Sequence, residues 1–122
     1  MYQEAAKELL AFIEKSPSTF HVIANVKEML EAEGFEELRE HQTWNLKKGG
    51  HYYVTRNGSS LIAFKVPQKE FCGFHIMASH SDAPTFRIKE NGEISVEKLY
   101  TKLNVEKYGG MLMAPWFDRP LS

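Results

Sequence analysis

The sequence has one cysteine, no excess of either charge and no long apolar run. Cys72 is the single cysteine among 122 residues, so no internal disulfide can form. The 15 basic and 16 acidic residues leave a net charge of −1, which gives no reason to expect nucleic acid or an anionic membrane as a partner. No apolar run approaches the roughly 20 residues that span a bilayer. These features together predict a cytoplasmic protein.

The first quarter of the chain has the pattern of two helices. Residues 3–15 carry apolar side chains at helical spacing, and this helix is expected to end before Pro17, because a residue preceding proline is pushed out of the α region. A second helix is expected to follow, because Ser18 or Thr19 can cap it. Gly34 is predicted to end that helix in a left-handed conformation. The sequence therefore predicts a helical hairpin.

Strand patterns dominate the rest of the chain. Residues 51–66 contain two apolar, β-branched or aromatic runs joined by Asn57-Gly58, a pair that favours the type I′ turn of a tight hairpin. Residues 71–79, FCGFHIMAS, form an almost unbroken apolar run that is typical of a central strand covered on both faces. Shorter strands are expected at residues 35–38, 44–46, 86–88, 94–96 and 102–105, with turn signals such as Asn91-Gly92 between them.

The order of these elements predicts an α/β fold in which an N-terminal helical hairpin precedes a mostly β segment. A central strand that is apolar on both faces needs helices on both sides, and the sequence supplies only two helices. The last residues, GGMLMAPWFDRPLS, are rich in aromatic side chains and stop abruptly. We therefore expect the chain to be the front part of a larger α/β protein.

His80 and Asp82 form the pattern with the clearest chemical meaning. They follow the apolar run of residues 71–79, and open α/β sheets place ligands at the carboxyl ends of such strands. A neutral imidazole is a good zinc ligand, and a carboxylate two residues on can orient the ring. The alternative is an ordinary turn with an Asp cap and a hydrogen-bonded histidine. One histidine cannot hold a metal alone, so the spacing by itself leaves both interpretations open.

The remaining chemistry-bearing residues favour structural roles. His75 is predicted to be a buried, hydrogen-bonded histidine, and Cys72 a small buried hydrophobe. Asp118 and Arg119 can form an ion pair beside Trp116, which we interpret as part of a structural or subunit-contact segment. The other histidines, His21, His41 and His51, carry no ligand spacing.

Five segments in a fixed order resemble a known family. They are "SPSTFH", "EGFEELRE" followed by a tryptophan, "YYVTRNGSSLIAFKV", "ASHSDAPTFRIK" and "YGGMLMAPWFDRPLS". The chain resembles the N-terminal part of the M18 family of metalloaminopeptidases, which contains aspartyl aminopeptidase and vacuolar aminopeptidase I. The resemblance extends over nearly all 122 residues.

The resemblance implies roles for individual residues. The family's His-Thr-Asp-Ser-Pro motif matches residues 80–84, so His80 is the expected metal ligand of a two-zinc centre. Asp82 is the expected catalytic-site carboxylate that acts on this histidine. Ser81 keeps the hydroxyl of the usual threonine, whereas Ala83 loses that of the usual serine. Other divalent metals, such as cobalt or manganese, can share such sites. The remaining ligands and a glutamate base are expected beyond Ser122.

The resemblance also implies a function and an assembly. Full-length members hydrolyse N-terminal residues from peptides and form homo-oligomers, often dodecamers, and we do not expect these 122 residues to be active alone. Residues 1–89 would be the N-terminal part of the catalytic domain, and residues 90–122 the start of an inserted dimerisation domain. Two alternatives are a non-catalytic assembly module derived from this fold and a different dinuclear-metal hydrolase.

Overall fold

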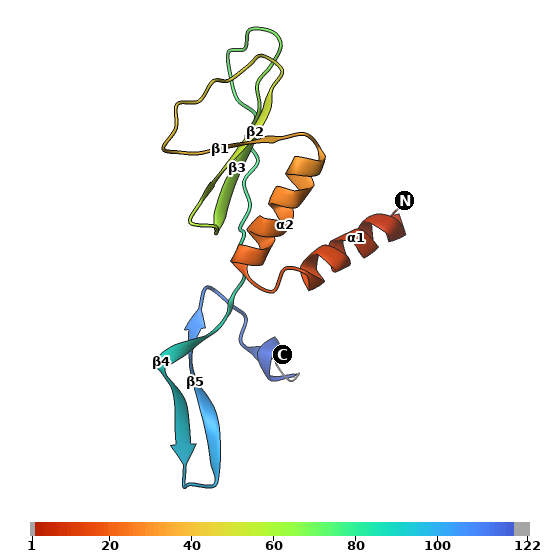
Figure 1. Ribbon diagram of the computed structural model, residues 1–122. Coiled ribbons are helices and arrows are strands. Elements are labelled where there is room, and N and C mark those ends of the chain that lie inside the picture. Colours follow the sequence, from red (N-terminus) through yellow and green to blue (C-terminus); the bar gives the residue numbers. More distant parts are fainter. Residues whose placement is uncertain (1, 119–122) are drawn as a thin grey trace. The chain divides into compact units, whose positions relative to one another are not determined.

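The computed structural model describes residues 2–118, which divide after Asp82 into two compact units (Figure 1). The first unit contains two helices and a three-stranded sheet, and the second contains a two-stranded hairpin and a short 3-10 helix. The predicted α/β class, with a helical hairpin followed by a mostly β segment, is confirmed. No helix within residues 2–118 is long and apolar enough to cross a membrane.

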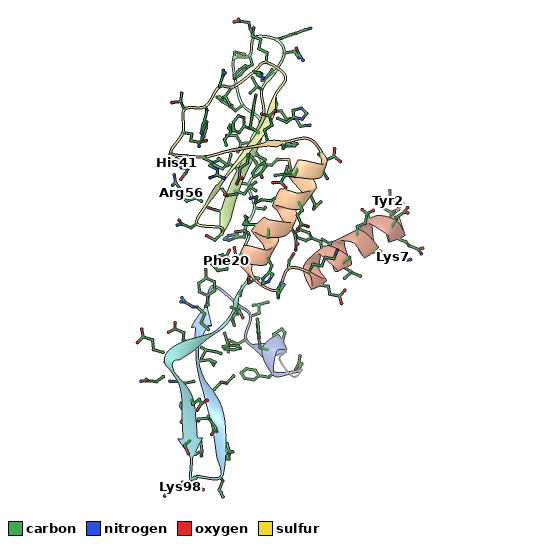
Figure 2. All side chains as sticks on the ribbon, viewed as in Figure 1. Tyr2, Lys7, Phe20, His41, Arg56 and Lys98 are labelled. Atoms are coloured by element: carbon green, nitrogen blue, oxygen red, sulfur yellow. The ribbon has the colours of Figure 1, made fainter. Side chains whose placement is uncertain are left out.

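The two predicted helices are present. α1 spans Tyr2–Glu14 and α2 spans Thr19–Ala32. Gly34 has a φ of +78°, as predicted for a residue that ends a helix in the left-handed region. All of the α1 side chains are at least partly exposed, and Tyr2 and Lys7 extend from the helix in Figure 2. The amphipathic pattern of α1 therefore marks an apolar face that stays accessible in this unit.

The sheet of the first unit has the order β1-β2-β3. β1 (Glu36–Leu38) pairs in parallel with β2 (His51–Arg56), and β2 pairs antiparallel with β3 (Ser60–Lys65). Asn57 and Gly58 have φ values of 54° and 64°. Both values are positive, as a type I′ turn requires, so the predicted hairpin is confirmed.

The small core of the first unit lies on the central strand β2. Tyr52, Tyr53 and Val54 are buried there, together with Ile23 of α2. The hydroxyl of Tyr53 donates to the Glu31 carboxylate of α2, so this side chain faces the helix. Burial raises the pKa of Tyr53, and the bond to Glu31 raises it further.

The predicted strand at residues 44–46 is wrong, because these residues belong to a loop that covers the other face of β2. The indole of Trp44 lies 6.5 Å from the ring of Phe64 between centroids. Its Nε1 donates to the carbonyl of Arg39 at 2.9 Å. The Lys47 N–H donates to the hydroxyl of Tyr52 at 3.0 Å instead of to a neighbouring strand. Aromatic packing and side-chain hydrogen bonds thus hold this loop, in place of the backbone hydrogen bonds of a strand.

The predicted central strand at residues 71–79 is also wrong for this chain. The segment has no regular secondary structure, and Phe74, Ile76 and Met77 are 81%, 83% and 99% exposed. A strand needs backbone partners, and among the described residues the sheet ends at β3. The same exposure corrects the expectation that Cys72 and His75 are buried.

The second unit is a long antiparallel hairpin of β4 (Thr85–Val96) and β5 (Tyr100–Tyr108). The separate strands expected at 86–88 and 94–96 are one strand, because the pairing shifts between Ile88 and Glu93 without ending. Asn91-Gly92 therefore lies within a strand and not in a turn. The chain reverses instead at Glu97 and Lys98, with φ values of 49° and 58°.

The 3-10 helix η1 (Ala114–Phe117) follows this hairpin. The ring of Trp116 meets that of Phe86 edge to face, with centroids 5.2 Å apart, which supports a structural role for the tryptophan. The ion pair expected between Asp118 and Arg119 includes Arg119, which lies outside the described residues.

Candidate metal-binding site

His80 and Asp82 contact each other directly. The Nδ1 of His80 lies 2.9 Å from Oδ1 of Asp82. An ionised carboxylate only accepts hydrogen bonds, so in this contact Nδ1 carries the proton. In the neutral ring the lone pair then lies on Nε2, which is the form of histidine that binds zinc. The His80 side chain is 92% exposed, so Nε2 is accessible to a ligand.

The pair lies in an irregular segment between β3 and β4. The sequence instead predicts a position at the carboxyl end of a strand. Side-chain hydrogen bonds join this segment to the rest of the first unit through Ser81. The Ser81 hydroxyl donates to the carbonyl of Ser59 at 2.8 Å. The Thr19 hydroxyl donates to Ser81 Oγ at 3.1 Å. The segment is thus anchored to the β2–β3 turn and to the first residue of α2.

The anchoring role of Thr19 and Ser59 has no signal in the sequence around either residue. From the sequence, Thr19 is a possible helix cap and Ser59 a residue of the hairpin. Thr19 is 40 residues from Ser59 and 62 from Ser81 along the chain, so no local pattern brings the three together. The sequence indicates only that Ser81 keeps a hydroxyl group, without indicating its partners.

Among the described residues, His80 can supply one metal-binding nitrogen, and the Asp82 carboxylate can orient its ring. Within residues 2–118, no three His, Cys, Asp or Glu side chains gather as a ligand set. His21 contacts the hydroxyl of Ser18 at 2.8 Å, and the ring of His51 packs on Phe35. His80 therefore fits one ligand of a metal centre, with Asp82 as its hydrogen-bond partner. Both roles remain predictions.

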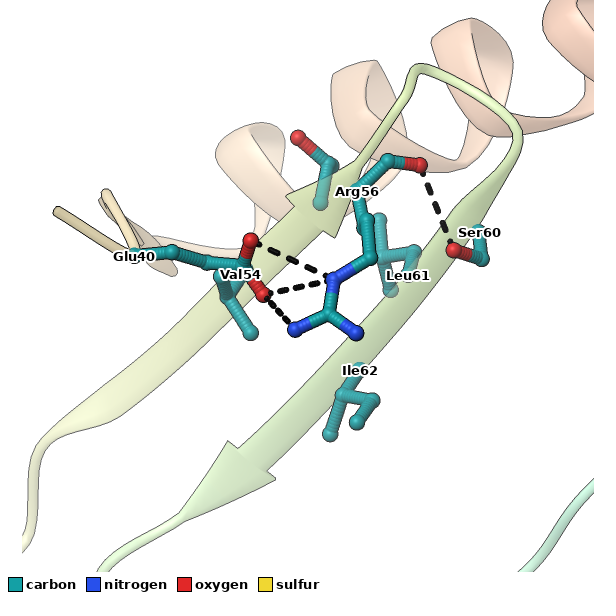
Figure 3. A pocket seen from close by; sticks show the side chains of 7 residues that line it. Glu40, Val54, Arg56, Ser60, Leu61 and Ile62 are labelled. Carbon is teal, nitrogen blue, oxygen red and sulfur yellow. Dashed lines mark hydrogen bonds and ion pairs between the residues drawn. The ribbon is translucent and has the colours of Figure 1, made fainter.

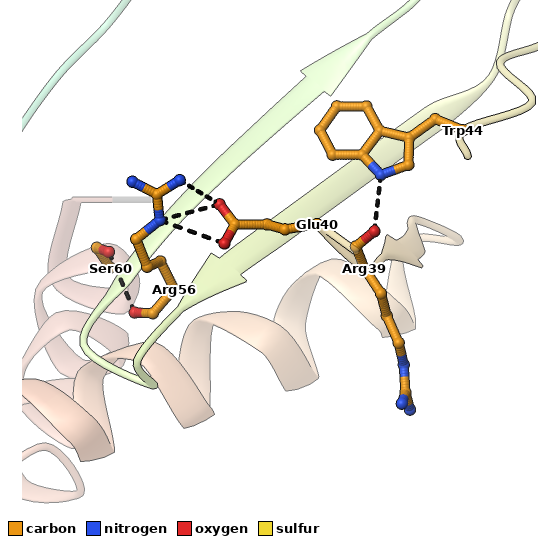
Figure 4. Close-up of polar contacts among 5 residues, drawn as sticks. All are labelled: Arg39, Glu40, Trp44, Arg56 and Ser60. Carbon is orange, nitrogen blue, oxygen red and sulfur yellow. Dashed lines mark hydrogen bonds and ion pairs between the residues drawn. The ribbon is translucent and has the colours of Figure 1, made fainter. Parts of the chain in front are cut away.

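A second polar cluster lies at the start of the loop that follows β1. Nε of Arg56 donates to both carboxylate oxygens of Glu40, at 2.9 and 3.3 Å, and Nη2 donates to Oε1 at 2.6 Å (Figure 4). The Arg56 guanidinium lowers the pKa of Glu40, and the carboxylate in turn raises the pKa of Arg56. The pair therefore stays ionised and fastens this loop to the end of β2.

This ion pair borders a small pocket of about 200 Å³ on the β2–β3 hairpin (Figure 3). Leu61 and Ile62 of β3 form part of its apolar lining. Both carboxylate oxygens of Glu40 already accept hydrogen bonds from Arg56, and the pocket lining contains no histidine or cysteine. The pocket thus offers neither a general base with a shifted pKa near neutrality nor a metal-ligand set.

The sequence matches a described family and several named relatives. A family model for the aminopeptidase I zinc metalloproteases (M18) matches residues 12–122. A probable M18 family aminopeptidase 2 of Clostridium novyi is 50% identical over 119 residues, which cover 96% of this chain and 28% of that protein. Its namesake in Pseudomonas aeruginosa is 44% identical over 124 residues, which cover all of this chain and 29% of that protein.

Solved structures share the fold as well. Yeast aminopeptidase 1 superposes with a TM-score of 0.85 at 33% identity, covering 98% of this chain and 28% of that one. A chain in the cryo-EM structure of the Ape4 and Nbr1 complex gives a TM-score of 0.88 at 39% identity, covering 96% of this chain and 23% of that one. The chain thus spans between 23% and 29% of the length of these relatives.

Fold and sequence together place this chain among the zinc metallopeptidases. More narrowly, it belongs to the M18 family of aminopeptidase I zinc metalloproteases.

Proposed function

We propose that the chain is the N-terminal part of a dinuclear-metal aminopeptidase that hydrolyses N-terminal residues from peptides. Relatives named as probable M18 family aminopeptidases, 50% and 44% identical, support this activity. The single observation that carries it is the contact of His80 Nδ1 with Asp82 at 2.9 Å, in an exposed ring. This contact prepares a histidine for metal binding within the family's own motif.

In the proposed enzyme His80 is one ligand of a two-zinc centre, and Asp82 keeps its ring oriented and its Nδ1 protonated. Zinc in such a centre supplies Lewis-acid polarisation of the peptide carbonyl and an activated water. The other ligands and the glutamate base would be supplied by residues outside this chain. We therefore propose that residues 1–122 alone are inactive, and that cobalt or manganese can replace zinc.

Domain roles and assembly are part of the same proposal. Residues 1–89 would be the first part of the catalytic domain, and residues 90–122, with most of the β4–β5 hairpin, the start of an inserted dimerisation domain. A related structure is described as an mApe1 dodecamer from yeast, which supports a homo-oligomer for the intact protein. Peptides are the proposed substrates, with neither nucleic acid nor membrane as partner. We also propose a cytoplasmic location, because Cys72 is the single cysteine of these 122 residues and forms no disulfide within them.

Replacing His80 in the intact protein that carries this chain tests the proposed function. We expect His80→Ala to lower kcat/KM for short peptides by about 100-fold or more and to reduce bound zinc, because a metal ligand is lost. Zinc content by elemental analysis and release of the N-terminal residue are the two measurements.

His75→Ala is the matched control, because it removes an imidazole of the same segment that lies outside the motif of residues 80–84. It should keep both zinc content and activity. If His80→Ala retained its zinc and its activity, the proposal that His80 is a metal ligand would be refuted.

A further inference from the structure

Three groups meet at the point where the His80 segment touches the rest of the first unit. They are the hydroxyls of Thr19 and Ser81 and the backbone carbonyl of Ser59. Thr19 Oγ1 lies 3.1 Å from Ser81 Oγ and 3.2 Å from the Ser59 oxygen, and Ser81 Oγ lies 2.8 Å from that oxygen. All three contacts are partly buried, although His80 and Asp82 beside them are exposed.

The proton count fixes the direction of these bonds. Each hydroxyl has one proton, and a carbonyl has none. Ser81 makes the shortest contact, so it donates to the Ser59 carbonyl and must accept from Thr19. The proton of Thr19 is then shared between Ser81 Oγ and the Ser59 oxygen. The arrangement needs hydroxyls at positions 19 and 81, but at position 59 it needs only the main chain.

We infer that Ser81 and Thr19 are positioning residues for the metal ligand His80. This inference rests on the proposed function, because it presumes that His80 binds zinc. Ser81 lies between His80 and Asp82, and consecutive Cα atoms are about 3.8 Å apart, so fixing Ser81 fixes the backbone of both neighbours. Asp82 then sets the tautomer and rotation of the ring, while Ser81 sets where the ring stands relative to α2 and the β2–β3 turn.

Within the described residues, no strand pairing holds the His80 segment in place. The segment at residues 71–80 is exposed along its whole length and has no strand pairing in the described part of the chain. A ligand on such a segment samples many positions unless a specific contact holds it, and each misplaced position weakens metal binding. The hydroxyl cluster supplies such a contact to the start of α2 and to the β2–β3 turn.

The test measures zinc affinity in the intact protein, by competition with a chromophoric chelator, together with the unfolding midpoint of the zinc-free protein. His80→Ala should abolish the binding of the zinc ion that His80 holds. For that ion, we expect Ser81→Ala to raise the dissociation constant about 10-fold. Ser81→Thr should keep the wild-type value because it retains the hydroxyl. Thr19→Val, which has nearly the same shape, should give a smaller increase of about 3-fold to 10-fold, in line with one lost hydrogen bond.

Ser59→Ala is the matched control, because it removes a neighbouring serine hydroxyl but keeps the carbonyl that accepts both bonds. It should leave zinc affinity unchanged. An unchanged affinity in Ser81→Ala, or an equal loss in Ser59→Ala, would overturn the inference. Should Ser81→Ala not fold, Thr19→Val against Thr19→Ser decides the question in the same way. If instead His80→Ala binds zinc normally, the proposed function itself fails, which separates the two failures.

Discussion

Tyr53 is the most deeply buried side chain of the described residues, so we expect the stability of the first unit to depend strongly on it. Its side chain is fully buried on the central strand, and its hydroxyl donates to the Glu31 carboxylate. Tyr53→Ala removes a buried ring, which costs about 3–5 kcal/mol in the free energy of unfolding. Tyr53→Phe keeps the ring and removes only the hydrogen bond. A bond to a charged group contributes about 1.5–3 kcal/mol, and because Glu31 is exposed and can be rehydrated, we expect a loss of about 1–2 kcal/mol.

Urea unfolding followed by circular dichroism measures both losses. With a slope of about 1.5 kcal/mol per M, Tyr53→Phe should lower the midpoint by about 1 M. Tyr53→Ala should lower the midpoint by about 2–3 M, from its loss of about 3–5 kcal/mol. Tyr2→Phe is the matched control, because Tyr2 is 91% exposed and its hydroxyl should not affect the midpoint.

Two results would refute this reasoning. If Tyr53→Phe behaved like Tyr2→Phe, the contact with Glu31 would contribute nothing to stability. If Tyr53→Ala lost no more than Tyr53→Phe, the ring would not belong to the core, and the core would have to lie elsewhere than on β2.

Two further predictions concern the same unit. The folded-state pKa of Tyr53 lies above the value of about 10 for an unfolded tyrosine. The stability that the protonated hydroxyl contributes is therefore complete below about pH 10 and is lost as the pH rises through the folded-state pKa. Above about pH 10, urea midpoints should fall more steeply in the wild type than in Tyr53→Phe. Gly34→Ala should cost about 1 kcal/mol in unfolding free energy through its φ of +78° alone, because an added Cβ would meet no atom within 4 Å; a loss well above this in thermal unfolding would indicate a packing role instead.

Local signals made the helical hairpin and the β2–β3 hairpin predictable. Pro17 ends the first helix, Gly34 ends the second, and Asn57-Gly58 supports only a tight turn. Each of these signals acts within a few residues, so neighbouring packing has little influence on the outcome.

The predictions that proved wrong concern segments whose structure depends on residues far away in the sequence. An apolar run such as residues 71–79 indicates a tendency to be buried, but a strand also needs a neighbour, and none pairs with it among the described residues. In the second unit, cross-strand pairing overrode the turn signal of Asn91-Gly92 and placed the reversal at Glu97 and Lys98. These two residues have no intrinsic preference for positive φ, so no pattern predicted the turn.

In the candidate site too, a contact between residues close in sequence was predictable and contacts between distant residues were not. His80 and Asp82 are two residues apart, so a direct contact between them follows from their spacing, and the structure has it at 2.9 Å. The contact of Ser81 with Thr19 and Ser59 joins residues far apart in sequence, and only the fold reveals it. Orientation of the ring is therefore encoded locally, whereas its location depends on the packing of α2 against the β2–β3 turn. This division has a consequence for mutations: changes at Asp82 should alter the ring itself, while changes that shift α2 or the turn, even without touching His80, should weaken the site through Ser81.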